Sequence, residues 1–245
     1  MTLHEFGHFF VSILVHAQQI SIHHNYTSNV EEGLSLANNL FIKGAGPFVS
    51  LVIGILFHFI CSRQANRNIL FLFNLYMSVF GYIGFFGYLL IAPMFSDGDT
   101  GYVCYALGFP IWLTIIIALA GAVVLYCLIN ILTKYFVEMG SKEIIENKEA
   151  RKSFIRSLLL YPILIGIVLT TLLNLPTPAF ISLIAPICSP LTFMWGYRNA
   201  LKKNYSTNNA NKKFDDLNKP HPWLFVFFVL TFIGNRLLVN GIYVN

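Results

Sequence analysis

Long apolar segments constrain this chain more than any other feature of its sequence. Five runs approach the roughly 20 residues that a helix needs to cross about 30 Å of hydrocarbon. They occupy residues 44–61, 69–92, 110–132, 154–175 and 223–239. A sixth run, at 179–197, contains Pro186 and Pro190 and fits either a span or a re-entrant segment.

Composition shows which medium these runs belong to. The chain is 56% hydrophobic and 11% charged, with a mean hydropathy of +0.65, whereas ordinary soluble domains carry about 25% charged residues. A further apolar run at 3–15 raises the expected number of spans to six or seven. The predicted fold class is an all-α polytopic membrane protein with six to seven transmembrane helices and a short β-strand or hairpin element after the first helix.

The first apolar run contains the motif His4-Glu5-Phe6-Gly7-His8. On a helix, residues four apart lie one above the other on a single face, so His4 and His8 could hold one zinc ion (Zn2+). Glu5 lies one step round the helix, where it could take a proton from the attacking water. The alternative is a pair of buried histidines beside an unrelated glutamate, which leaves a carboxylate in an apolar run at a cost of about 2–3 kcal/mol or more. The motif therefore predicts metal chemistry.

A zinc ion held by two histidines needs a third protein ligand and a position left for water. Asp97 and Asp99 lie between two predicted spans, in a segment without Lys or Arg. A carboxylate oxygen from either residue meets the need, and an ordinary Asp-Gly turn at 97–98 is the alternative. The residues alone leave the choice between the two aspartates open.

The segment after the first helix predicts a strand. Residues 18–26 read QQISIHHNY, in which Ile20 and Ile22 alternate with polar neighbours. We expect a polar loop at 27–39, with Phe41 and Ile42 in a returning strand. Beside a metal site, an extended strand could bind an unwound substrate segment by strand addition.

The second apolar run opens with Gly44, Ala45, Gly46 and Pro47. Small residues permit close approach to a neighbouring helix, and Pro47 suits a first helical turn. We therefore expect a helix that begins near Gly44 and packs tightly against the helix that carries the histidines.

Together these motifs resemble the site-2 protease family of membrane-embedded zinc metalloproteases. The likeness covers roughly residues 1–120: the HEFGH motif, a strand-bearing loop, the Ala-Gly-Pro at 45–47, and an Asp-Gly pair after a helix that ends at Pro93. Residues 96–112 are also similar to a compact bacterial branch of the family that lacks a PDZ domain. The family's Asp-Gly motif usually follows Leu and precedes a second Gly, whereas Ser96 and Asp99 flank it here, and Ser50 stands where an Asn is common.

The resemblance implies an intramembrane zinc endopeptidase. Carried over, the family pattern gives His4, His8 and Asp97 as zinc ligands and Glu5 as the general base for hydrolysis of peptide bonds in membrane-spanning substrates. The implied partners are a transmembrane protein substrate and the lipid bilayer. The implied location is a bacterial cytoplasmic membrane, which the chain would cross several times.

Basic residues predict the domain organisation and the orientation. We expect a metalloprotease core at 1–133, a charged connection at 134–156, and accessory C-terminal helices at 157–245 with a polar loop at 199–218. All Lys and Arg except Lys43 and Arg236 fall at 63–67, 134–156 and 198–219, on one side of a seven-span arrangement, which the positive-inside rule makes cytoplasmic. The strand loop and Asp97 then face outward, although the family's zinc site usually lies nearer the cytoplasmic face. The net charge of +5 fits loops that face anionic lipid and is no nucleic-acid footprint.

Other readings of the residues stay open. A non-proteolytic membrane scaffold or chaperone could keep the same fold. A prenyl-protein type membrane zincin would take its third ligand from a glutamate on a later helix, here Glu138. His16, His23 and His24 read as interfacial or solvated side chains, not ligands. The four cysteines lack a Cys-x-x-Cys spacing and predict neither disulfides nor a thiolate metal site.

The position of Met1 leads to one more expectation. Only two residues separate it from His4, whereas a spanning metal helix should have two or more turns before its site. We therefore expect that further residues precede Met1 in the natural protein.

Overall fold

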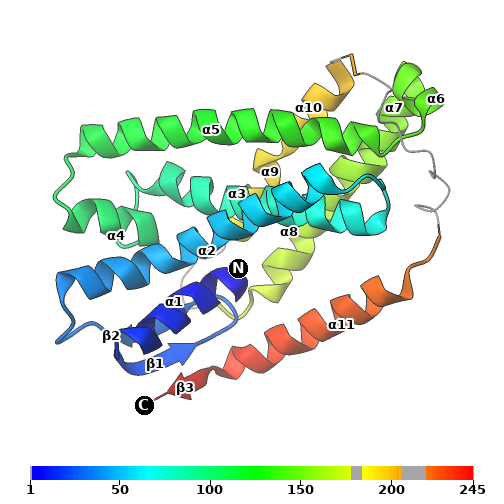
Figure 1. Cartoon of the computed structure of the whole chain (residues 1–245). Helices are drawn as coiled ribbons and strands as arrows, with labels where there is room; N and C mark the ends of the chain where they lie inside the picture. The colour runs from blue at the N-terminus through cyan, green and yellow to red at the C-terminus, as the bar shows by residue number, and fades with distance from the viewer. Residues whose placement is uncertain (1, 178–183, 203, 206–218, 245) are drawn as a thin grey trace.

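The structure, a computed structural model, describes residues 2–177, 184–202, 204–205 and 219–244. It is mostly helical, with a small three-stranded sheet beside the C-terminus and the end of the first helix (Figure 1). Five helices are long and apolar enough to cross a membrane, as in an integral membrane protein: Leu36–Arg63, Ile69–Ile91, Ile111–Glu138, Lys148–Leu173 and Pro222–Asn240. Within the described residues, these five candidates do not confirm the expected six or seven spans.

The motif helix α1, Thr2–Leu14, is not among the five. Its 13 residues extend only about 20 Å, less than the thickness of the hydrocarbon layer. It ends where His16 takes a left-handed conformation with φ of 56°. Helix α1 packs closely on the next helix, because Gly7 leaves no room for a side chain: a Cβ there would lie 2.8 Å from the Ala45 carbonyl oxygen.

Helix α2, Leu36–Arg63, begins two turns earlier than predicted. Its start is fixed by Ser35, whose side chain accepts a hydrogen bond from the backbone N–H of Asn38. Pro47 therefore lies inside the helix and not in its first turn. Because proline has no N–H, the carbonyl of Lys43 lacks its usual helical partner in this part of α2.

Helices α3, Ile69–Ile91, and α5, Ile111–Glu138, complete the main bundle with α2. Gly81 of α3 meets Gly54 of α2 so closely that a Cβ on Gly81 would lie 2.4 Å from the Gly54 nitrogen. The larger hydrophobic core lies chiefly between α3 and α5 and includes Phe71, Leu75, Val79, Leu125, Ile129 and Phe136. The short helix α4, Asp99–Ala106, lies in the connection between α3 and α5 and packs on α2.

The rest of the chain is a series of shorter helical pieces. After α5 come α6, Lys142–Glu146, and α7, Lys148–Ile155, then the π-helical turn η1, Arg156–Leu160, and α8, Tyr161–Leu173. The predicted run at 179–197 lies partly outside the described residues. Its described part forms α9, Ile184–Thr192, and α10, Met194–Lys202, which are separated at Phe193. The last helix is α11, Pro222–Leu237, which leads through the turn η4, Leu238–Asn240, to the final strand.

The sheet joins the N-terminal and C-terminal parts of the chain. Strands β1, Gln18–Ile22, β2, Thr27–Val30, and β3, Ile242–Val244, lie in the order β2-β1-β3, and both pairings are antiparallel. The strand predicted within 18–26 is present as β1. The predicted return at Phe41 and Ile42 is wrong, because these residues belong to α2, and the returning strand is β2. Strand β3 was not predicted.

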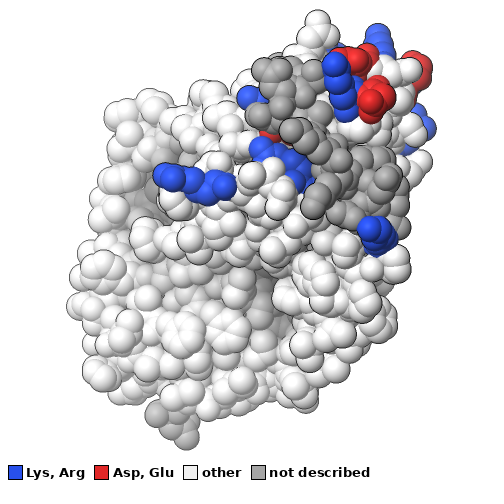
Figure 2. All heavy atoms as spheres, turned by 45° about the vertical axis from the view of Figure 1, so that its right-hand side comes forward, with Lys and Arg blue, Asp and Glu red and all other residues white. Residues whose placement is uncertain are grey.

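Charge is distributed unevenly over the molecule. Figure 2 shows the charged side chains gathered at one end of the face in view, with an uncharged surface below them. Of the basic residues that the structure describes, only Lys43 and Arg236 belong to the opposite half, near the sheet, as the positions of their helices in Figure 1 show. The metal motif on α1 lies toward this less charged end.

Candidate metal centre

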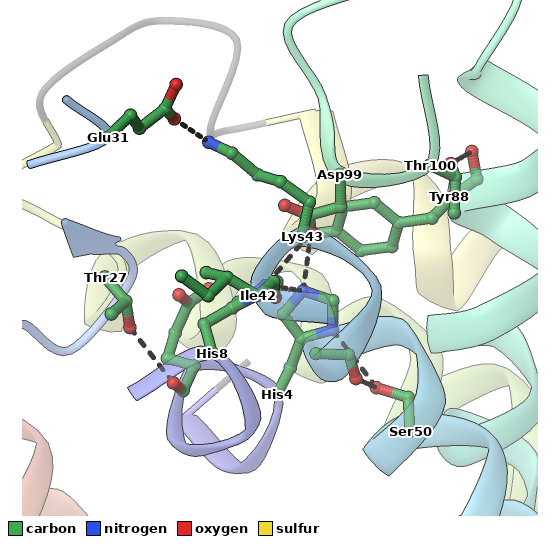
Figure 3. Close-up of polar contacts among 12 residues, drawn as sticks. His4, His8, Thr27, Glu31, Ile42, Lys43, Ser50, Tyr88, Asp99 and Thr100 are labelled. Atoms are coloured by element: carbon green, nitrogen blue, oxygen red, sulfur yellow. Dashed lines mark hydrogen bonds and ion pairs between the residues drawn. The ribbon is translucent and has the colours of Figure 1, made fainter. Parts of the chain in front are cut away.

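The two motif histidines lie side by side on the inner face of α1. His4 and His8 are buried, and their rings meet edge to face with centroids 4.8 Å apart. Their Nε2 atoms are separated by 3.1 Å. The helical spacing read from the sequence therefore brings two potential ligand atoms to one point (Figure 3).

Each histidine is held through its other ring nitrogen. His8 Nδ1 donates to the carbonyl oxygen of Ile42 at 2.6 Å. His4 Nδ1 lies 3.2 Å from Ser50 Oγ, and because that hydroxyl donates to the Gly46 carbonyl, it accepts from His4. Hydrogen bonds of this kind fix the orientation and tautomer of metal-binding histidines. Both Nε2 atoms are left facing the same point.

The third member of the cluster is Asp99, at the start of α4. Its Oδ2 atom lies 2.9 Å from His4 Nε2 and 3.3 Å from His8 Nε2. Ligand atoms about 2.1 Å from a tetrahedral zinc ion lie roughly 3.4 Å from one another, close to the observed spacings. Within the described chain, these three residues form the group of His, Cys, Asp or Glu side chains able to hold a metal ion.

Asp97, the ligand chosen from the family pattern, is not brought to the histidines. It lies exposed in the turn before α4, whereas Asp99 turns inward as the first residue of the helix. The turn is compact around Gly101, where a Cβ would lie only 1.9 Å from the Phe95 carbonyl oxygen. The structure thus selects the aspartate that stands where the family usually has a second Gly.

The neighbouring histidines shape the acidity of Asp99. Burial alone would raise the pKa of its carboxyl group, but the hydrogen bonds of His4 and His8 and the positive charge that these rings carry when protonated outweigh burial and lower the pKa. Asp99 therefore carries a full negative charge at neutral pH. A carboxylate beside two imidazoles is a donor set that suits zinc.

Glu5 is buried next to the histidine pair. Its backbone carbonyl accepts a hydrogen bond from Thr27 Oγ1 at 3.0 Å, which ties α1 to the start of β2. Its carboxylate is near enough to His8 to interact with it electrostatically. None of the described residues donates a hydrogen bond to the Glu5 carboxylate, so its oxygens are available to a water molecule.

Gly46 lies directly against the cluster. A Cβ at this position would be 2.3 Å from His8 Nε2 and 2.6 Å from His4 Nε2. No side chain fits there without displacing the two ligand atoms. The sequence indicated a close helix contact here but gave no sign that Gly46 borders the metal position itself.

Lys43 and Glu31 lie at the outer side of the cluster. Their side chains form an ion pair of 3.0 Å, and the Lys43 ammonium also lies 5.4 Å from the centre of the Tyr102 ring. Figure 3 shows Lys43 extending from α2 past Asp99 toward Glu31. The pair connects the segment after β2 with α2 and α4 around the site.

Other residues considered from the sequence lie elsewhere. Glu138, at the far end of α5, is paired with Arg67 at 3.0 Å and does not belong to the described cluster of His4, His8 and Asp99. His16 is exposed. The prediction of solvated side chains is wrong for His23 and His24, which are buried because His23 stacks on Tyr26 and His24 bonds to the Asn174 carbonyl. The residues that fix the histidines, Ser50 and the Ile42 carbonyl, were not predicted, because their contacts depend on how α1 and α2 pack.

The chain was compared with known families, curated proteins and solved structures. No family model, no curated protein and no solved structure matches the chain. The function proposed below therefore rests on the geometry of the site and on the sequence motifs.

Proposed function

We propose that this chain is an intramembrane zinc endopeptidase. The observation that carries the proposal is the convergence of His4 Nε2, His8 Nε2 and Asp99 Oδ2 at mutual distances of 2.9 to 3.3 Å beside the buried Glu5. Zinc hydrolases commonly bind the ion through imidazoles and a carboxylate. A separate glutamate that is not a ligand can then act on the zinc-activated water.

His4, His8 and Asp99 would hold the ion, and the chain's other residues would carry out the proton transfers. When bound, zinc supplies Lewis-acid chemistry that polarises a carbonyl group and makes a water molecule more acidic. Glu5 takes a proton from the attacking water as the new C–O bond forms. It then gives that proton to the leaving amine as the C–N bond breaks, so that one residue serves as base and then acid.

The setting of α1 supports a membrane-spanning substrate. The outer face of the helix exposes large apolar side chains, including Leu3, Phe10 and Leu14, and no other described helix covers them. A substrate segment in the bilayer could therefore approach the metal helix from the side. The proposed partners are accordingly a transmembrane protein and the surrounding lipid.

The sheet offers a way to present an unwound substrate backbone. Both edges of β1 are occupied, by β2 and β3, so strand addition at β1 itself is blocked. The outer edge of β2 is free of any described strand, and β2 begins at Thr27, which bonds to the Glu5 carbonyl. We propose that substrate pairs with β2.

On the resemblance to the compact branch of the site-2 protease family, we place the protein in a bacterial cytoplasmic membrane.

Cleavage of a transmembrane substrate in detergent or liposomes tests this function. Wild-type protein loaded with zinc should cleave within the membrane segment, and Glu5→Gln should be inactive while it retains zinc, because the amide cannot move the proton. Glu32→Gln, a change of an exposed residue outside the site, is the matched control and should cleave normally. Cleavage by Glu5→Gln at the wild-type rate would contradict the proposal.

A further inference from the structure

Helix α3 carries three tyrosines, Tyr76, Tyr82 and Tyr88, whose hydroxyl groups differ in one respect. Tyr76 donates to the carbonyl oxygen of Leu158, and the Tyr82 hydroxyl bonds to His58 Nδ1 at 3.0 Å. The hydroxyl of Tyr88 bonds to none of the residues that the structure describes.

Tyr88 is also the tyrosine that touches the metal centre. Its ring stacks on His4 with centroids 4.6 Å apart and planes inclined by 19°. Its carbonyl oxygen accepts a hydrogen bond of 2.6 Å from Thr100 Oγ1, next to Asp99. The ring thus lies against α1, while the backbone of Tyr88 is bonded to α4 (Figure 3).

The Tyr88 side chain lies against His4 and close to both acidic residues of the site. It is near enough to both Asp99 and Glu5 to interact with their charges, yet it donates a hydrogen bond to neither among the described contacts. Phenylalanine would supply the stacking on His4 equally well. The stacking therefore does not account for the hydroxyl group.

We propose that Tyr88 is a further catalytic residue, whose O–H donates a hydrogen bond to the scissile carbonyl oxygen as that oxygen becomes negatively charged. This inference depends on the proposed peptidase function. Tyr88 keeps its proton throughout, and Glu5 moves the one proton that passes from water to the leaving amine. Because the ring is already held in place, the donor needs no rearrangement when charge develops, and donors of this kind contribute about 10²–10³ in kcat.

Inhibitor binding separates this role from a structural one. We would measure zinc content and the affinities of two peptides that bind metal, one with a phosphinic group and one with a thiol, in wild type and Tyr88→Phe. A phosphinic group mimics the tetrahedral oxyanion, whereas a thiol offers no such oxygen. We expect unchanged zinc content and thiol affinity, about 100-fold weaker phosphinic binding, and a similar fall in kcat without a change in KM.

Tyr82→Phe is the matched control. It removes a hydroxyl from the same helix, but one that is bonded to His58, so both inhibitor affinities should stay at wild-type values. Phosphinic binding by Tyr88→Phe equal to wild type would overturn the proposal, as would a parallel loss of zinc and thiol binding, which would show that Tyr88 only positions His4. Wild-type protein that binds neither zinc nor either inhibitor would instead overturn the peptidase function, and the role of Tyr88 with it.

Discussion

Gly46 has no side chain, and this leaves room for a metal ion between the two histidines. A Cβ would lie 2.3 Å from His8 Nε2, so Gly46→Ala should abolish zinc binding even though alanine favours a helix by about 1 kcal/mol. Gly44→Ala is the matched control, because nothing lies within 4 Å of a Cβ at that position of the same helix. Zinc content of the two purified variants is the measurement, and equal zinc in both would contradict the placement of the site.

Ser50 acts through His4. Without its hydroxyl, His4 Nδ1 loses the acceptor that orients the ring, and such losses lower metal affinity about 10–100-fold. We expect Ser50→Ala to weaken zinc binding by that factor in a competition titration with a chelator. Ser62→Ala removes a hydroxyl that bonds within the same helix, to the Phe59 carbonyl, and should bind zinc as wild type does. A Ser50→Ala affinity that matches this control would show that His4 needs no such support.

At the residue scale, the sequence predicts the histidine pair and Glu5 but not the third ligand. His4, Glu5 and His8 were found because helical spacing alone places them together. The choice between Asp97 and Asp99 could not be made from spacing, since both border Gly98, and only the inward start of α4 separates them. The one signal for Asp99 was its departure from the family pattern.

At the scale of elements, close helix contacts position the site. A Cβ on Gly81 would meet backbone atoms of Gly54 at 2.4 and 2.6 Å and the Ser50 carbonyl oxygen at 2.8 Å. Gly81→Ala should therefore push α3 away from α2 and lower stability by about 1–3 kcal/mol. Gly166→Ala, on α8, meets nothing within 4 Å and is the control. Thermal unfolding in detergent measures the difference, and equal midpoints would contradict the packing described.

Elements were predictable where hydrophobicity alone defines them. The predicted runs that form α3, α5 and α11 begin within one residue of the observed helices, because a span must be apolar. Their predicted ends differ from the observed ones by one to six residues. The start of α2 was missed, since polar residues such as Asn38 and Asn39 hid its first two turns. Strand β3 was missed as well, because its pairing with β1 joins residues that are more than two hundred positions apart.

At the scale of the whole molecule, charge predicts orientation. The described basic residues other than Lys43 and Arg236 belong to the half that contains the α2–α3 connection and α6. The positive-inside rule makes that half cytoplasmic and places the sheet on the outer side.

Cysteine labelling in intact cells tests this orientation. In a cysteine-free background, Glu32→Cys should react with a membrane-impermeant maleimide in intact cells, because the exposed turn after β2 faces outward. Glu146→Cys, exposed at the end of α6, should react only after the membrane is permeabilised. The reverse pattern would contradict the orientation.

Zinc content of the purified protein tests the central claim most directly, with wild type compared with Asp99→Ala and Asp97→Ala. We predict about one zinc ion per chain in wild type and in Asp97→Ala, and none in Asp99→Ala, because only Asp99 reaches the two histidines. The two variants remove the same group two residues apart, so each is the control for the other. Zinc retained by Asp99→Ala and lost from Asp97→Ala, or absent from all three proteins, would contradict the account.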